Sequence, residues 1–286
     1  MAKLAFLGTG LIGGAMAEAA AKRGDEVTVW NRSPAKARAL EAFGAKVATT
    51  PEDAARGAAR VHVVLTDDAA VDAVLDACGA SLDGGAVVVD HTTASPAGTV
   101  LRAKRLAERG VAFLHAPIFM SPKMAREGGG MMLASGPRAV FERAEAGLAA
   151  MTGSVKYLGE RPDLAAANKL FGNAMILAVT AGLADVFAMA ASLGIAAEDA
   201  RSLFATFNPA NTINYRGLAM AQGDYTPSFE LTMARKDARL MIETADTAHR
   251  LHFLPAIAAR MDALLAQGHG QDDLGILAVD AVPARR

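Results

Sequence analysis

Six short apolar runs alternate with alanine-rich segments in the first half of the chain. The runs cover residues 3–8, 26–30, 61–65, 86–90, 112–116 and 131–135, and helical spacing recurs over 11–23, 34–43, 68–81 and 97–109. Continuous apolar runs are typical of parallel strands that are covered on both faces. The alternation of strands with helices therefore predicts an α/β fold with a doubly wound parallel sheet.

The pattern changes after about residue 160, where no further β-rich run occurs. Residues 163–193 predict one long helix, about 45 Å at ~1.5 Å per residue, and Gly194 is a plausible stop for it. Further helices are predicted at 196–206, 229–250 and 255–267. We therefore expect an α/β domain over residues 1–161 and an all-helical domain over residues 162–286.

Composition excludes several classes of protein. The chain has 286 residues, of which 52% are hydrophobic and 21% charged, and its net charge of −1 offers no basic surface for nucleic acid. The single cysteine, Cys78, leaves no disulfide framework, and the N-terminal sequence lacks a secretory signal, so we expect a cytoplasmic protein. The apolar stretch 170–184 is shorter than the ~20 residues of a membrane span. We expect it to form a buried helix and expect no membrane partner.

The first predicted strand runs directly into Gly8-Thr9-Gly10-Leu11-Ile12-Gly13, and a predicted helix begins there. In a dinucleotide site the first glycine permits a tight turn, the second lets pyrophosphate approach the backbone, and the third lets helix and strand pack closely. The helix N-terminus adds free N–H groups for the phosphates. We therefore expect a Rossmann nucleotide site here, with glycines needed only for the turn as the alternative.

The end of the second predicted strand indicates which nucleotide is bound. An acidic residue at this place binds the ribose 2′-hydroxyl in NAD sites, but this chain has Asn31, Arg32 and Ser33. The Arg32 guanidinium can pair with a 2′-phosphate, and Asn31 and Ser33 can add hydrogen bonds. The sequence predicts NADP(H) as cofactor, with Lys36 as a weaker contact. A solvated arginine at a strand end is the alternative.

Four segments, in order, resemble the β-hydroxyacid dehydrogenases, a family that includes 3-hydroxyisobutyrate dehydrogenase and the glyoxylate/succinic semialdehyde reductases. FLGTGLIGGAMA (6–17) resembles the N-terminal signature, and DHTTASP (90–96) resembles the substrate loop. NKLFGN (168–173) resembles the catalytic lysine segment, and ARKDARL (234–240) resembles the K-D-L segment. The resemblance implies hydride transfer between a nicotinamide cofactor and a small aldehyde or β-hydroxy acid.

Lys169 and Asn173 are the predicted catalytic residues. They are four apart and share one face of the long helix, which is otherwise apolar. A lysine in such surroundings costs free energy unless it has a partner or a task. Beside a nicotinamide it can give a proton to the substrate oxygen or remove one from it, and Asn173 can orient the lysine or the substrate. The alternative is a lysine that extends its amine into water.

Other predicted contacts follow from the resemblance. Thr92 and Thr93 match substrate-loop positions, and Thr93 also matches a position near the nicotinamide. Leu65 and Thr66 match residues that line the cofactor, and Lys236 matches one that reaches it from the helical domain. Capping of the helix after Pro96 remains an alternative for Thr92 and for Ser95, as does a surface charge for Lys236.

The chain departs from the family after the fifth predicted strand. Members usually have Ser-Gly-Gly there, where small residues bind the substrate carboxylate, whereas this chain has Phe119, Met120 and Ser121, followed by Lys123. All four are predicted to contact the substrate, with bulky apolar groups changing the pocket. A carboxylate is therefore less certain, although Ser121 and Lys123 can bind one. His91, beside the threonines, is a further polar candidate in contact with or behind the substrate.

We therefore expect an NADP-dependent reductase or dehydrogenase acting on a small molecule, with the helical domain forming a homodimer or homotetramer. An imine reductase of the same fold and a non-catalytic NADP-binding protein remain alternatives. No metal is expected, because His249 and His252 are three apart on a predicted helix but have no evident third ligand, and no zinc motif occurs.

Overall fold

The computed structural model describes residues 2–82 and 85–285. Within these residues the chain forms two compact units that meet between Asn173 and Ala174. This division falls inside the long helix, α8 (Asp163–Ser192), rather than near residue 161. The start of α8 belongs to the first unit because Ala165 and Ala166 are buried there.

The first unit is built on a parallel sheet, as predicted. Its strands, within the described residues, have the order β3-β2-β1-β4-β5-β6. They are β1 (Lys3–Leu7), β2 (Glu26–Trp30), β3 (Lys46–Val47), β4 (Arg60–Val63), β5 (Val87–Asp90) and β6 (Ala112–His115). The connecting helices are α1 (Leu11–Lys22), α2 (Pro34–Arg38), α3 (Pro51–Ala55), α4 (Asp68–Cys78) and α5 (Pro96–Glu108). The order reverses between β1 and β4, which opens a crevice at the carboxyl edge of the sheet.

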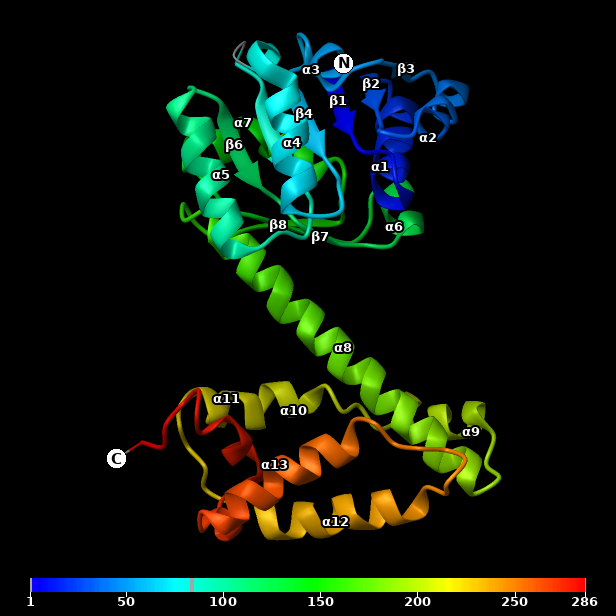
Figure 1. Ribbon diagram of the computed structural model, residues 1–286, viewed down its shortest axis with the longest axis vertical. Helices are drawn as coiled ribbons and strands as arrows, with labels where there is room; N and C mark the ends of the chain where they lie inside the picture. Colours follow the sequence, from blue (N-terminus) through cyan, green and yellow to red (C-terminus); the bar gives the residue numbers. More distant parts are fainter. Residues whose placement is uncertain (1, 83–84, 286) are drawn as a thin grey trace. The chain divides into compact units, whose positions relative to one another are not determined.

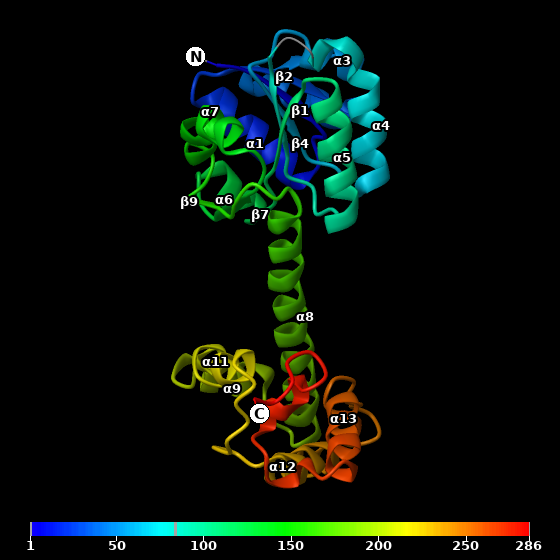
Figure 2. The same ribbon diagram turned by 90° about the vertical axis from the view of Figure 1, so that its left-hand side faces the viewer.

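Helices cover both faces of this sheet (Figure 2), which explains the continuous apolar runs. Alternate residues of β1 enter different cores, with Phe6 on one face and Leu7 on the other. Phe6 shares its core with Met16 of α1, and Leu7 shares its core with Leu75 of α4. Such fully buried side chains each contribute about 1.5–3 kcal/mol.

The predicted strand at 131–135 forms, but it lies outside the main sheet. It is β8 (Met131–Ala134), placed between β7 (Ile118–Phe119) and β9 (Ser154–Tyr157) in a second sheet. The order of elements along the chain does not reveal this second sheet, because β8 pairs antiparallel with β7, a two-residue strand that follows β6. Two helices accompany this sheet, α6 (Pro122–Arg126) and α7 (Arg138–Ala149).

The helix predicted at 34–43 is shorter than expected. It ends at Arg38 and is followed by a 3₁₀ turn, Glu41–Phe43, that closes on Gly44. Gly44 has a φ of +87°, a conformation that favours glycine. The break allows Leu40 to be buried in the core.

The expectation of a buried helix at 170–184 is wrong for the single chain. The long helix α8 is labelled in Figure 1. Several of its large apolar side chains are open to solvent, among them Phe171 (66% exposed), Ile176 (55%) and Leu177 (69%). By length and composition alone α8 would be able to cross a membrane, which is weak evidence because other apolar helices pass the same test.

The second unit is helical, as predicted. Its helices after α8 are α9 (Ala197–Ser202), α10 (Asn211–Asn214), α11 (Arg216–Ala221), α12 (Leu231–Thr244) and α13 (Leu254–Ala266). Leu231 of α12 and Leu264 of α13 share its core. α12 ends before residue 250 because the Asp246 carboxylate accepts hydrogen bonds from the Ala248 and His249 amides. The helix predicted at 196–206 changes at Leu203 into a 3₁₀ turn.

Candidate active site

Three glycines shape the turn between β1 and α1. Gly8 has a φ of +103°, and a side chain there would overlap the Val64 carbonyl oxygen of the neighbouring chain segment. A side chain at Gly13 would overlap the carbonyl oxygen of Gly8, whereas a Cβ at Gly10 would meet nothing within 4 Å. Gly8 and Gly13 therefore serve the turn itself. Gly10 leaves open space beside the first turn of α1, where unpaired N–H groups and the helix dipole favour a phosphate.

A cavity of about 770 Å³ lies at this turn and has the size of a cofactor site. The structure brings together around it the following residues predicted to bind the cofactor: Gly8, Gly10, Leu11, Ile12, Gly13, Asn31, Arg32, Ser33, Leu65 and Thr66. Lys36, the weaker candidate, also lines it. Sequence reasoning missed Trp30, Pro51 and Val74. Trp30 could have been predicted because it directly precedes Asn31 at the end of the same strand. Pro51 and Val74 could not, because their positions depend on how α3 and α4 pack.

The residues after β2 have unequal tasks. The Asn31 side chain is used within the protein, since its Oδ1 accepts from the Thr9 amide at 3.0 Å and its Nδ2 donates to the Ser33 carbonyl at 3.0 Å. It therefore joins the glycine turn to the end of β2. Arg32 is exposed, and within the described residues its guanidinium has no partner. Ser33 precedes α2 without capping it through its side chain.

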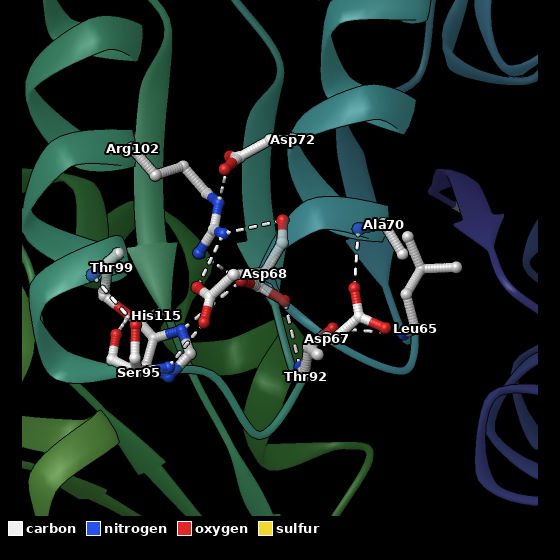
Figure 3. Close-up of polar contacts among 12 residues, drawn as sticks. Leu65, Asp67, Asp68, Ala70, Asp72, Thr92, Ser95, Thr99, Arg102 and His115 are labelled. Atoms are coloured by element: carbon white, nitrogen blue, oxygen red, sulfur yellow. Dashed lines mark hydrogen bonds and ion pairs between the residues drawn. The ribbon is translucent and has the colours of Figure 1, made fainter.

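The segment after β5 is tied to the segment after β4 (Figure 3). Thr92 is buried, and its Oγ1 accepts from the Leu65 amide at 3.1 Å, while its own amide donates to Asp90 Oδ1 at 2.9 Å. The Thr92 hydroxyl is thus turned into the protein, which differs from the predicted substrate contact. Thr93 is exposed, and no described residue bonds its hydroxyl. The Ser95 hydroxyl caps α5 by accepting from the Gly98 amide, so the capping alternative holds for this residue.

Arg102 of α5 holds these segments from behind (Figure 3). Its side chain is fully buried and contacts Asp68 at 2.9 Å, Asp72 at 2.8 Å and the buried Asp90 at 3.4 Å. Asp68 in turn accepts from the Ser95 amide at 2.9 Å. Burial alone would raise the pKa of Asp90, but His115, Arg102 and the Thr92 amide hold it below its usual value. Asp90 is therefore ionised, and the network fixes both loops at the sheet edge.

Two further histidines form a buried chain across the sheet. The Ala116 carbonyl, 2.7 Å from His91 Nδ1, only accepts, so His91 carries its proton on Nδ1. Its Nε2 then accepts from His62 Nδ1 at 2.9 Å. Burial lowers the pKa of His91 to about 4 and that of His62 well below its usual value, so both are neutral. His91 is a structural residue behind the site, one of the two roles considered for it.

Lys169 stands on the first turns of α8. The start of this helix is fixed by Ser135, whose hydroxyl donates to the Pro162 carbonyl and accepts from the Ala165 amide. Lys169 Nζ lies 3.8 Å from the centre of the Phe119 ring. Partial burial lowers the pKa of Lys169 below its usual value. β6 ends beside β5 at the pair Asp90–His115, and β7, which carries Phe119, begins three residues later. The Lys169 amine, held against Phe119, therefore lies next to the chain that leaves the carboxyl edge of the main sheet.

The remaining predicted residues are placed as follows. Asn173 is half-buried at the end of the first unit, one helical turn after Lys169. Met120 is half-buried, the Ser121 hydroxyl caps α6 by accepting from the Met124 amide, and Lys123 is exposed. Lys236 belongs to the second unit, where its Nζ pairs with Asp237 at 2.8 Å.

The family is decided by comparison with known proteins. Residues 3–159, more than half of the chain, match the NAD binding domain of 6-phosphogluconate dehydrogenase. Glyoxylate/succinic semialdehyde reductase 2 of Arabidopsis thaliana is 29% identical over 96% of this chain and 78% of its own length. The chain belongs to the β-hydroxyacid dehydrogenase family. As a family member it is an NAD(P)-dependent oxidoreductase.

The similarity to solved structures covers both units of the chain. A reductive aminase from Aspergillus terreus, solved with NADPH and ethyl levulinate, is 26% identical, with a TM-score of 0.88 over 99% of both chains. An imine reductase from Streptomyces aurantiacus is 27% identical, with a TM-score of 0.87 over 98% of this chain and 99% of its own.

Proposed function

We propose that this protein is an NADP-dependent oxidoreductase that transfers a hydride between nicotinamide and the carbonyl carbon of a small aldehyde or β-hydroxy acid. Lys169 is its general acid and base. The observation that carries the proposal is the Lys169 amine, which is partly desolvated and stands at the same edge of the sheet as the glycine turn. Relatives that are named as semialdehyde reductases support this class of reaction.

Cofactor preference is assigned to Arg32. Its guanidinium lines the cavity, has no partner in the part of the chain that the structure describes, and suits a 2′-phosphate. The residues next to it, Asn31 and Ser33, are not acidic and so do not supply the carboxylate that binds a 2′-hydroxyl. NADPH in the Aspergillus terreus structure supports the same choice. Arg32→Ala is expected to lower the NADPH-to-NADH ratio of kcat/KM by at least about tenfold. An unchanged ratio would refute the assignment.

The bound cofactor supplies the hydride, and the chain's own residues manage the proton. In reduction, the Lys169 ammonium donates a proton from Nζ to the carbonyl oxygen, where negative charge develops. In oxidation, the neutral amine removes the hydroxyl proton. The lowered pKa of Lys169 brings the neutral amine closer to the working range of pH. The exposed Thr93 hydroxyl and Asn173 are assigned to holding the substrate.

The test is NADPH oxidation, followed at 340 nm, with glyoxylate, succinic semialdehyde and uncharged short aldehydes. Lys169→Ala is compared with Lys104→Ala, which removes an exposed lysine of α5 that has no predicted role in binding. We expect the Lys169 variant to lose at least about a hundredfold in kcat while it still binds NADPH. Little loss of rate with intact binding would refute the acid–base role.

Imine reduction is the second candidate. The Streptomyces aurantiacus and Aspergillus terreus structures, whose names refer to imine reduction and reductive amination, support it. Lys169 argues for carbonyl substrates, since an ammonium stabilises the negative charge that develops on a carbonyl oxygen. A cyclic imine, assayed beside the aldehydes, distinguishes the two. A kcat/KM higher for the imine than for every aldehyde would favour the second candidate.

The partner we propose is a second copy of the chain, in a cytoplasmic homodimer or homotetramer. The support is the apolar surface of α8, where Ile176, Leu177 and Val179 are all more than half exposed. Apolar surface of this extent is typical of an interface. We propose neither a nucleic acid nor a membrane as a partner.

A further inference from the structure

The Phe119 ring is fitted between two positions of α8. Lys169 Nζ lies 3.8 Å from the ring centre, within the range of a cation–π contact. One turn later, a Cβ at Gly172 would lie 2.9 Å from Phe119 Cε1 and closer still to Cζ. The ring therefore occupies the space that any side chain at position 172 would need. Phe119 and Gly172 form one packed unit that carries the Lys169 amine.

The neighbours of this ring are apolar. Met131 is the partner of Phe119 in the pairing of β7 with β8. Met120 follows Phe119 and packs against the core of the first unit. Both methionines are half-buried. The ring that carries the amine thus has the Met131 thioether as its cross-strand neighbour, and both suit apolar groups.

Polar groups of the same segment are already used or exposed. The Ser121 hydroxyl caps α6, the Thr92 hydroxyl accepts from the Leu65 amide, and the Lys123 side chain is exposed. Among the described residues of this segment, no second buried cation stands beside Lys169. A carboxylate placed against the ring would lose hydration and would compete with the reacting oxygen for the Lys169 ammonium, which costs free energy.

We propose that Phe119, fitted against Gly172, selects uncharged substrates with an apolar substituent over short semialdehydes that carry a carboxylate. This inference rests on the proposed function, because it assumes that Lys169 faces the reacting oxygen. The ring covers one side of the ammonium, so the remaining N–H groups are left for that single oxygen. Phe119 is thus a specificity-determining residue, and Gly172 is a positioning residue.

The experiment compares succinic semialdehyde with 4-methylpentanal, in which an isopropyl group of the same size replaces the carboxylate. We expect kcat/KM of the wild type to favour 4-methylpentanal by at least about tenfold, and Phe119→Ser to reduce this preference by at least about tenfold. Phe119→Leu, which keeps the apolar bulk, is the matched control and should retain it. A preference for succinic semialdehyde, or an unchanged preference in Phe119→Ser, would overturn the substrate class and leave the proposed function intact. Absence of turnover with every aldehyde and imine would refute both.

A second measurement does not depend on activity. Gly172→Ala should lower the melting temperature of the wild type, because its methyl group displaces the ring. The same change in a Phe119→Ala background should have little effect, since the space is then free. Equal effects in both backgrounds would show that ring and glycine are not one unit.

Discussion

Replacing Arg102 with methionine tests how the loops of the site are held. Methionine keeps most of the volume but removes the guanidinium that lies 3.4 Å from Asp90, and both of these side chains are fully buried. Removing one partner of a buried pair costs about 3–5 kcal/mol, because the other charge is left uncompensated. Asp90 keeps its contacts with the Thr92 amide at 2.9 Å and with His115 at 3.5 Å. We therefore expect Arg102→Met to lower the free energy of unfolding by about 3 kcal/mol, the low end of this range.

The other two partners of Arg102 add less to this loss. Asp68 and Asp72 have side chains that are 33% and 34% exposed, so water screens their charges. Each is expected to contribute about 0–1 kcal/mol. A domain with an ordinary stability of about 5–15 kcal/mol would still fold after the substitution. The variant is therefore measurable by equilibrium urea unfolding at pH 7.

A double-mutant cycle with Asp90→Asn isolates the buried pair. Once Asp90 is neutral, the loss of Arg102 no longer leaves a buried charge, so the two changes together should cost less than their sum. Arg105→Met is the control, since the Arg105 side chain is 41% exposed and contacts Asp72, and no ion pair joins it to Asp90 among the described residues. A loss below about 1 kcal/mol for Arg102→Met, or strict additivity with Asp90→Asn, would refute this account.

Three more predictions concern other parts of the chain. Gly10→Ala should weaken NADPH binding in a fluorescence titration without lowering the melting temperature, because its Cβ meets no protein atom. Gly14→Ala, in α1, is the control. Unchanged affinity of the Gly10 variant for NADPH would contradict a cofactor site at this turn. The free energy of unfolding should fall by about 3 kcal/mol from His91 alone as pH drops from about 6.5 to about 4, since only the unfolded state binds the proton there; a flat profile would argue against a buried neutral His91. Leu177→Glu should shift the mass measured by light scattering toward the monomer, and an unchanged mass would place the interface elsewhere.

The positions of most strands along the chain were predictable from local pattern, whereas the sheet that each strand joins was not. Residues 4–7 and 86–89 are continuously apolar because helices cover both faces of their sheet, and this leaves a direct trace in the sequence. The run at 131–135 has the same pattern but joins a second sheet, since its pairing depends on β7, which has only two residues. Burial of 170–184 failed as a prediction for a related reason. Apolar composition indicates that a surface will be covered but not whether the same chain covers it.

Residue types at the site were predictable, whereas the direction of their hydrogen bonds was not. Asn31 and Thr92 stand where ligand contacts were expected, yet their side chains bond to the Thr9 and Leu65 amides. A short motif gives the position of a polar group along the chain, but the group bonds whichever partner the fold brings nearest. Arg102 left no comparable signal, because its three acidic partners lie on α4 and at the end of β5, up to 34 residues away along the chain.

Phe119 and Gly172 show why a departure from a family pattern is hard to interpret from sequence. Fifty-three positions separate them (172 − 119), and neither residue alone indicates the other. In the structure the Phe119 ring fills the space that Gly172 leaves open, and the Lys169 amine lies against the same ring. A return to a small residue at position 119 would therefore remove the support of the amine along with the apolar wall. In the proposed site, substrate preference and the position of Lys169 are therefore coupled through this one contact.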